Sequence, residues 1–166
     1  MPGIAFYKCR KCGADREVVA KSFFIGPLPP YPLSRPAERA WLASHLISFV
    51  CDADEVELTL PRRISLPEWE KWRSGEKASQ LLIRFPFLLS ICAHIKRHLD
   101  VSPELEIDYG IVGCPYCGMK LEGKEGLKVA CTRCGESSMA LDGAGMVSLN
   151  RDWPPIPPSA RRAGNA

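Results

Sequence analysis

The sequence lacks the segments by which chains are exported or held in membranes. Its longest run of apolar residues, 85–93, is far too short to cross a bilayer. The first residues show no basic stretch followed by an apolar core, so we expect no signal peptide, no membrane association and a cytoplasmic location. Together these absences argue against an exported scaffold held by disulfide bonds, although the chain has eight cysteines.

Motifs of the common catalytic classes are also missing. The chain has no glycine-rich phosphate loop, no Gly-x-Ser-x-Gly turn and no His-Glu-x-x-His motif. It has only three histidines, and none is paired with an evident nucleophile. Asp52, Asp54, Glu55 and Glu57 gather at one turn, which is more typical of a solvated loop than of catalytic carboxylates. We therefore expect that the protein is not an enzyme.

Charge of either sign is in little excess. Lys and Arg number 22 against 19 Asp and Glu, a net charge of +3, which neither requires nor excludes a polyanionic partner. Hydrophobic residues make up 46% of the chain and charged residues 25%, which are globular proportions. The 166 residues suffice for one domain of ordinary size or for two small ones.

The first 110 residues alternate between strand and helix patterns, which predicts a mixed α/β body over residues 1–110. Apolar residues alternate with polar ones in the strand segments and recur at helical spacing elsewhere. The expected strands are 4–9, 17–25, 56–61 and 105–111. The expected helices begin at Pro36 and run through Val50, begin at the Ser65–Glu68 capping box and break at Gly75, and begin near Pro86 and run to about Leu99.

Prolines are concentrated in two segments that cannot be helices or central strands. Residues 26–36 contain five prolines and form either a connector or a binding segment. The tail, 151–166, carries Trp153, Pro154 and Pro155, an extended pattern that suits docking into a groove of a partner protein. The alternative for both segments is a linker or a strap packed over the body.

Six of the eight cysteines lie in three Cys-x-x-Cys-Gly turns, which start at Cys9, Cys114 and Cys131. The last two turns follow the spacing Cys-x2-Cys-x13-Cys-x2-Cys, and the intervening segment contains glycines that suit a hairpin. The glycine after each pair accepts the positive φ of a tight turn. Four thiolates then complete a tetrahedral shell for Zn²⁺, with iron and thiol redox chemistry as alternatives.

These two turns resemble the knuckles of the zinc-ribbon family, over residues 111–150. The resemblance implies a three-stranded β module around one structural Zn²⁺, ligated by Cys114, Cys117, Cys131 and Cys134. The expected fold class is thus α+β, a small mixed body with a C-terminal zinc ribbon. The family does not fix a function, but a closed four-thiolate shell leaves no position for water or substrate.

A second Zn²⁺ is expected at Cys9 and Cys12, which form only half of a site. His94 and His98 stand four residues apart on a predicted helix, so both can face one ion and complete a Cys₂His₂ shell. Other candidates for the missing ligands are Cys51, Cys92 and His45. A partner chain is a further source.

The first knuckle is also the most basic turn in the chain. Lys8, Arg10 and Lys11 surround it beside Tyr7, a pattern suited to DNA or RNA phosphates and bases. Our hypothesis is a non-catalytic zinc-binding adapter or structural subunit, which binds protein partners in a larger assembly. The alternatives are a nucleic-acid-binding accessory or regulatory protein that uses this knuckle, and a thiol redox protein that uses Cys9 and Cys12.

Overall fold

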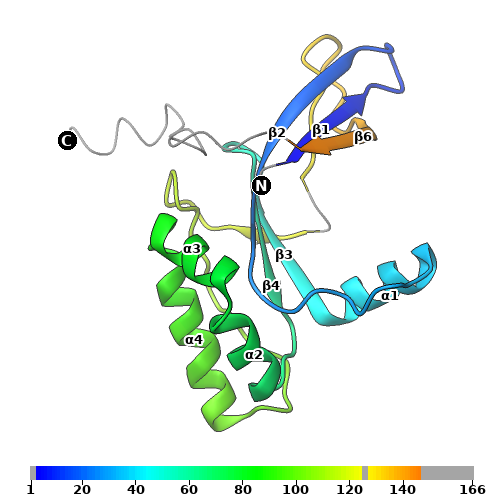
Figure 1. The fold of residues 1–166 in the computed structure, drawn as a ribbon. Helices are drawn as coiled ribbons and strands as arrows, with labels where there is room; N and C mark the ends of the chain where they lie inside the picture. Colours follow the sequence, from blue (N-terminus) through cyan, green and yellow to red (C-terminus); the bar gives the residue numbers. More distant parts are fainter. Residues whose placement is uncertain (1–2, 125–126, 147–166) are drawn as a thin grey trace, which may run out of the picture. The chain divides into compact units, whose positions relative to one another are not determined.

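The computed structural model describes residues 3–124 and 127–146, and over these the chain has the predicted mixed α+β fold (Figure 1). None of the described helices combines the length and apolarity needed to span a bilayer. The proposed partner-binding residues Trp153, Pro154 and Pro155 lie outside the described residues.

The strands are β1 (Gly3–Lys8), β2 (Asp15–Phe24), β3 (Leu46–Cys51), β4 (Val56–Pro61), β5 (Glu122–Gly123) and β6 (Ala140–Met146). The helices are α1 (Arg35–His45), α2 (Leu66–Arg73), α3 (Glu76–Arg84) and α4 (Leu88–Val101).

The chain divides into two compact units, each built from segments that are far apart in the sequence. The first unit combines Met1–Phe23, Ser48–Leu58 and Val112–Ala166, and the second combines Phe24–Ile47 and Thr59–Ile111. The strands follow the order β5-β3-β4-β2-β1-β6. The C-terminal cysteine-rich segment therefore shares a unit with the N-terminal hairpin and with the end of β3.

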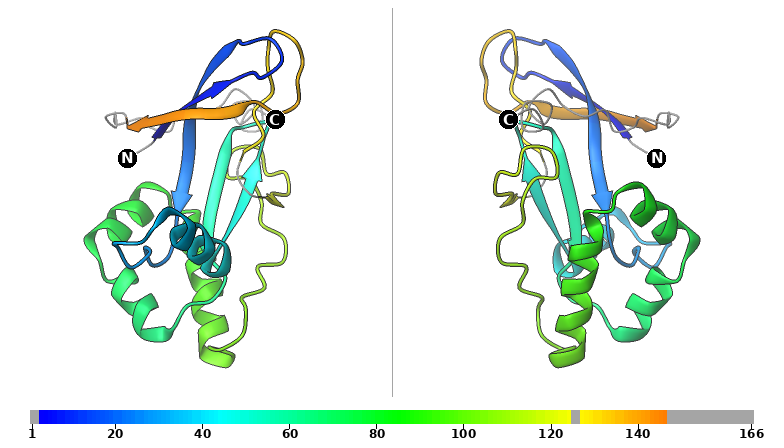
Figure 2. Two further views of the ribbon diagram at one scale, coloured as in Figure 1. Left: turned by 90° about the vertical axis from the view of Figure 1, so that its right-hand side faces the viewer. Right: turned by 90° about the vertical axis from the view of Figure 1, so that its left-hand side faces the viewer.

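In the first unit, both strands of the C-terminal segment pair with strands from earlier in the chain. β6 runs antiparallel to β1, with Lys8 opposite Ala140, and β5 runs antiparallel to β3, with Val50 opposite Glu122 (Figure 2). Among the described residues of 111–150, the segment bonds to itself through one isolated bridge, Gly113 to Lys120, and through single hydrogen bonds such as Met139 N–H to the Val129 carbonyl, but none of these forms a strand pair. The three-stranded module expected there is thus replaced by pairing with β1 and β3, because this short segment has few apolar residues with which to build its own core.

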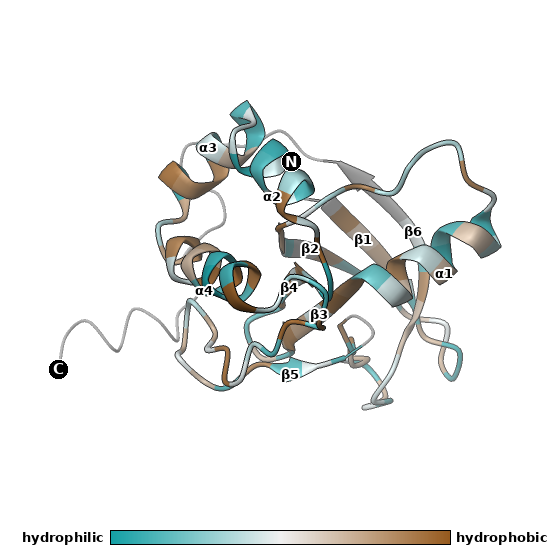
Figure 3. Cartoon of the chain, turned by 90° about the horizontal axis from the view of Figure 1, so that it is seen from below, coloured by the Kyte–Doolittle hydropathy of each residue, from teal (hydrophilic) through white to brown (hydrophobic). Residues whose placement is uncertain are grey.

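The second unit contains the four helices, and the three predicted starts, near Pro36, at the Ser65–Glu68 capping box and near Pro86, are confirmed for α1, α2 and α4. Ser65 and Glu68 form a capping box at the start of α2, and Gly75 is the N-cap of α3. Figure 3 shows hydrophobic and polar segments alternating along α4, an amphipathic pattern. The apolar side of α4 buries residues at helical spacing, namely Leu88, Cys92, Ile95 and Leu99.

The first predicted helix is shorter than expected. α1 ends at His45, and Leu46, Phe49 and Val50, which the pattern placed on one helical face, belong to strand β3. Their spacing fits a helix, but the run 46–51 also holds β-branched and aromatic residues that favour a strand. Pairing with β5 and burial of these side chains decide in favour of the strand.

The predicted strand at 105–111 is wrong. This segment has no strand in the structure and is held by separate contacts instead. The Ile107 N–H donates to the Arg62 carbonyl at 2.8 Å, the Tyr109 hydroxyl donates to the Pro61 carbonyl at 2.6 Å, and Glu106 forms an ion pair with Arg62. Leu105 and Ile111 remain 64% and 80% exposed. The segment is thus a strap held by individual hydrogen bonds and an ion pair, not by strand pairing.

Candidate metal centres

The three Cys-x-x-Cys-Gly segments fold into the same tight turn. In each one the glycine N–H donates to the carbonyl of the first cysteine, at 2.9 Å for Gly13, 2.9 Å for Gly118 and 3.0 Å for Gly135. These glycines have φ values of 72°, 74° and 75°, the left-handed conformation that side chains resist. The reason given for glycine at this position is therefore confirmed.

Each turn also directs backbone N–H groups at the sulfur of its first cysteine. The Cys131 Sγ accepts from the N–H of Cys134 and then of Arg133, and these bonds lower the pKa of Cys131 to about 6. The N–H of Cys12 lowers the pKa of Cys9 in the same way. Because metals bind the thiolate, such turns prepare the sulfur for ligation.

A fourth turn of the same shape was missed in the sequence because it contains one cysteine and no glycine. Cys51 and Asp54 occupy the positions of the two cysteines, and Glu55 takes the glycine position with a φ of 56°. The Glu55 carboxylate bonds to Arg16 Nη2 at 2.6 Å, which helps to hold this strained residue. The sequence did contain a signal for this turn. Asp54 follows Cys51 by three residues, the same spacing as in the Cys-x-x-Cys pairs, and a carboxylate can also be a zinc ligand.

The first cluster brings together Cys9, Cys12, Cys131 and Cys134, whose sulfurs all lie within 4.8 Å of one another. Sγ–Sγ distances are 3.6 Å for Cys9–Cys134 and 3.6 Å for Cys12–Cys131. A tetrahedral shell with Zn–S bonds of about 2.3 Å requires an edge of about 3.8 Å, whereas a disulfide requires about 2.0 Å. The cluster therefore has the dimensions of a metal site.

An apolar shell surrounds this first cluster. Val18, Val129 and Met139 are buried against the sulfurs, and Tyr7 and Leu127 pack on the same group. Cys9 and Cys131 are buried and Cys12 and Cys134 are half-buried, so the apolar side chains limit the access of solvent to the ligands.

The second cluster consists of Cys51, Asp54, Cys114 and Cys117, whose ligand atoms also lie within 4.8 Å of one another. The Asp54 Oδ2 lies 3.3 Å from the Cys114 Sγ and 3.7 Å from the Cys51 Sγ, and the Cys51 and Cys117 sulfurs are 3.9 Å apart. A tetrahedral zinc shell with mixed ligands has sulfur–oxygen edges of about 3.5 Å. The residues therefore fit a Cys₃Asp site.

Burial and local bonds define the environment of the second cluster. Asp54 is only 4% exposed, and desolvation by burial raises the pKa of Cys114 to about 12. The Lys21 ammonium donates to the Asp54 backbone carbonyl at 2.6 Å and lies 5.5 Å from the centre of the Tyr116 ring. A buried carboxylate among thiols requires compensation, and a divalent cation held by these four residues would supply it.

The predicted grouping of the C-terminal cysteines differs from the observed one. Cys114 and Cys117 lie in the second cluster, while Cys131 and Cys134 lie in the first. The strand register explains the exchange. β1 ends just before the first knuckle, and Ala140, opposite Lys8, begins the strand that follows the knuckle at 131–134, so both knuckles lie at one end of the pair.

The predicted histidine ligands are likewise not grouped with Cys9 and Cys12. The His94 Nε2 lies 2.6 Å from the Asp108 carbonyl, and the His98 Nε2 lies 3.0 Å from the Leu105 carbonyl. Both bonds fasten the strap that follows α4. Neither histidine belongs to a metal-sized group of ligands in the part of the chain that the structure describes.

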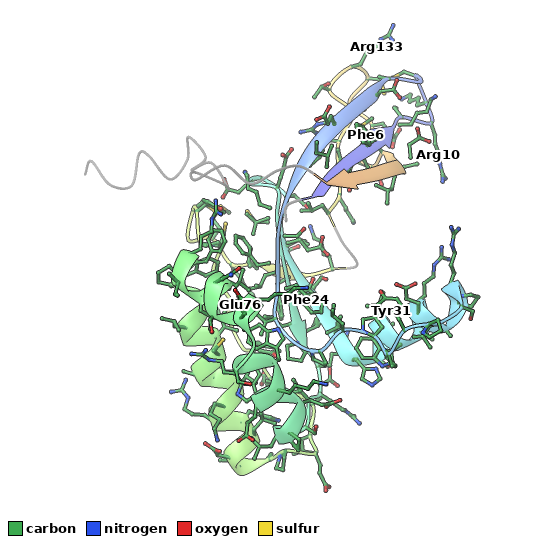
Figure 4. The ribbon with its side chains drawn as sticks, in the orientation of Figure 1. Phe6, Arg10, Phe24, Tyr31, Glu76 and Arg133 are labelled. Atoms are coloured by element: carbon green, nitrogen blue, oxygen red, sulfur yellow. The ribbon has the colours of Figure 1, made fainter. Side chains whose placement is uncertain are left out.

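The basic residues of the first knuckle are exposed. Lys8 ends β1, and Arg10 and Lys11 occupy the two positions between the cysteines. Lys8 stands opposite Asp15 of β2, whereas Arg10 and Lys11 lie in the turn and have no strand partner. Figure 4 shows the Arg10 side chain at this turn.

Comparison of the chain with models of protein families, with curated proteins and with solved structures gives no match. The argument on function therefore rests on the geometry of the two clusters.

Proposed function

We propose that this protein is a non-catalytic zinc protein, an adapter or structural subunit whose two Zn²⁺ ions stabilise a scaffold for binding. The observation that supports the proposal most is that each cluster offers four protein ligands at tetrahedral spacing. Four protein ligands leave no position for a water or a substrate, so neither ion would act as a Lewis acid. Both ions would join segments that are distant in the sequence.

Zinc fits the second cluster better than iron does. All-thiolate tetrahedra suit both metals, but a shell of three thiolates and one carboxylate is within the ordinary ligand choice of zinc. The 3.6 Å sulfur separations in the first cluster also favour metal ligation over thiol redox chemistry. Two closed sites in one unit are the arrangement expected of a structural role.

The first experiment is elemental mass spectrometry of the protein purified without added metal. We expect two zincs per chain. X-ray absorption, which averages over both ions, should then fit one zinc with four sulfur ligands and one zinc with three sulfur ligands and one oxygen ligand. Zinc absent from both clusters, or iron in their place, would contradict the proposal.

Cysteine variants then test the grouping of the ligands. Cys117→Ser and Cys131→Ser should each remove one zinc, and the double variant should remove both, because the two residues belong to different clusters. In a zinc ribbon at 114–134 the double variant would remove no more than either single one. Cys92→Ser is the matched control, since this buried cysteine lies outside both clusters and should leave two zincs.

The adapter role requires a partner. Size-exclusion chromatography and chemical cross-linking of the zinc-loaded chain in extracts of its own cells should place it in a larger complex. A chain that migrates only as a monomer there would contradict this part of the proposal while leaving the zinc sites intact.

A further inference from the structure

The first cluster joins two loops whose residues the sequence keeps far apart. Arg10 and Lys11 lie between the cysteines of one knuckle, and Arg133 lies between those of the other. The cysteines of the two knuckles are separated by 119 and 125 positions in the pairs whose sulfurs lie 3.6 Å apart. Three cations are thereby gathered around one metal centre.

We propose that Arg10, Lys11 and Arg133 form a surface that binds the phosphates of a nucleic acid. The inference rests on the first zinc site of the proposed function, because that ion holds the two loops together. All three side chains are exposed, and Figure 4 shows Arg10 and Arg133 extending outward from their turns. We refer to these three residues as the knuckle cations.

The charge of the knuckle cations is available to a ligand. Among the described residues, none of the three forms an ion pair, whereas Arg16 on the neighbouring strand is paired with Glu55. A site with one Zn²⁺ and four thiolates carries a formal charge of minus two. The three cations exceed that charge, and they lie on the solvent side of the turns, where a polyanion can reach them.

The structure changes which residues belong to the surface. Lys8 was a predicted member, but it stands opposite Asp15, and the next pair on that face of the sheet is Phe6 with Glu17. Two carboxylates therefore offset Lys8. Arg133 was not among the predicted residues, and it joins the surface because the first cluster places its knuckle beside the knuckle at 9–12. Glu136 follows Arg133 by three residues, but among the described residues the two form no ion pair.

A nucleic acid is the partner that suits this arrangement best. Guanidinium groups bind phosphate oxygens through two parallel hydrogen bonds, and cations on protruding turns can follow a repeating phosphate backbone. No groove is required for such contact, and its affinity comes largely from released counterions. Binding should accordingly depend on salt and little on base sequence.

Fluorescence anisotropy with a labelled single-stranded RNA of mixed sequence tests the proposal on the zinc-loaded full chain. We expect binding at low salt with a log–log salt slope of about −2, from about three phosphates at about −0.7 each. Arg133→Ala should weaken binding at least about fivefold and reduce the slope, and the triple alanine variant of the knuckle cations should abolish binding. Lys8→Ala and Arg97→Ala, an exposed arginine on α4, are the matched controls and should bind like the unaltered protein.

Three results would overturn the proposal: no binding at low salt by a chain that holds two zincs, an Arg133→Ala variant that binds normally, or equal binding of a polyglutamate peptide of the same charge. Zinc content is measured for every variant. If a variant loses both its zinc and its RNA binding, the cations would serve to neutralise the thiolates of the zinc site. That result would also overturn the proposed nucleic-acid-binding surface. RNA binding by a chain whose clusters hold no zinc would contradict the proposed function instead, so the two failures are distinguishable.

Discussion

Asp54 is the one candidate ligand that makes the two clusters chemically different. It occupies the position of a fourth thiolate, is buried, and approaches two of the three sulfurs with one carboxylate oxygen. Thiolates are the softer ligands and hold zinc more strongly than a single carboxylate oxygen does. The second cluster should therefore release its ion first under competition.

Substitution of Asp54 should change zinc retention at one cluster alone. We expect Asp54→Ala to lower the zinc affinity of the second cluster by at least about tenfold and Asp54→Cys to raise it, because the number and softness of the ligands change. Titration with a chromogenic chelator would measure both effects. The exposed Asp142 provides the control Asp142→Ala, and an Asp54→Ala variant with unchanged affinity would exclude Asp54 as a ligand.

Cys92 differs from the cysteines of the two clusters, because it is buried but belongs to neither group of candidate metal ligands. Burial on α4 raises the pKa of Cys92 to about 11 from a usual 9.0, so the folded state holds this proton more tightly than the unfolded state does. Its contribution to stability is complete below pH 9.0 and is lost as the pH rises toward about 11. Urea unfolding should therefore show a smaller alkaline loss of stability in Cys92→Ala than in the unaltered protein, and equal losses would contradict the assignment.

At the scale of the element, the capping box of α2 is the clearest local feature. The Ser65 hydroxyl accepts from the Glu68 N–H, and the Glu68 carboxylate accepts from the Ser65 N–H, a bond that lowers the pKa of Glu68. The stabilisation is present above the usual carboxyl pKa and is lost as the pH falls through the lowered value.

Removal of this cap has a predictable effect on stability. Ser65→Ala should reduce the free energy of unfolding by about 1 kcal/mol, since one helix N–H loses its partner. Ser65→Thr keeps the hydroxyl and should lose much less. Denaturant unfolding at neutral pH measures the difference, and a similar loss in both variants would indicate a packing effect at that position.

Local patterns predicted most of the elements but not their pairing. The starts of α2 and α3, the amphipathic face of α4 and the geometry of the glycine turns all follow from residues within a few positions of one another. The pairing of β6 with β1 does not, because it depends on a register between residues 140 and 8. The grouping of the cysteines follows from this pairing, so the knuckles were predicted correctly and their partners were not.

At the scale of the whole molecule, both clusters lie in the same compact unit, and the four helices lie in the other. Removal of zinc by a strong chelator should therefore disrupt the first unit while much of the helical circular dichroism signal persists. The Cys92→Ser variant, whose two clusters are intact, should lose zinc at the same chelator concentration and provides the reference. Complete loss of the helical signal on chelation would show that the two units unfold as one.

The distance between paired knuckles has a consequence for how the chain is made. Cys9 and Cys12 leave the ribosome early, yet their partners emerge only after more than a hundred further residues have been added. Closing the nearby alternative, with thirteen residues between Cys117 and Cys131, costs about 2 kcal/mol less in chain entropy than closing the observed loop. The ligands of the second cluster, Cys51, Asp54, Cys114 and Cys117, have all been made before Cys131. During synthesis that site can thus bind its ion first, which would withdraw Cys114 and Cys117 from the shorter alternative with Cys131 and Cys134.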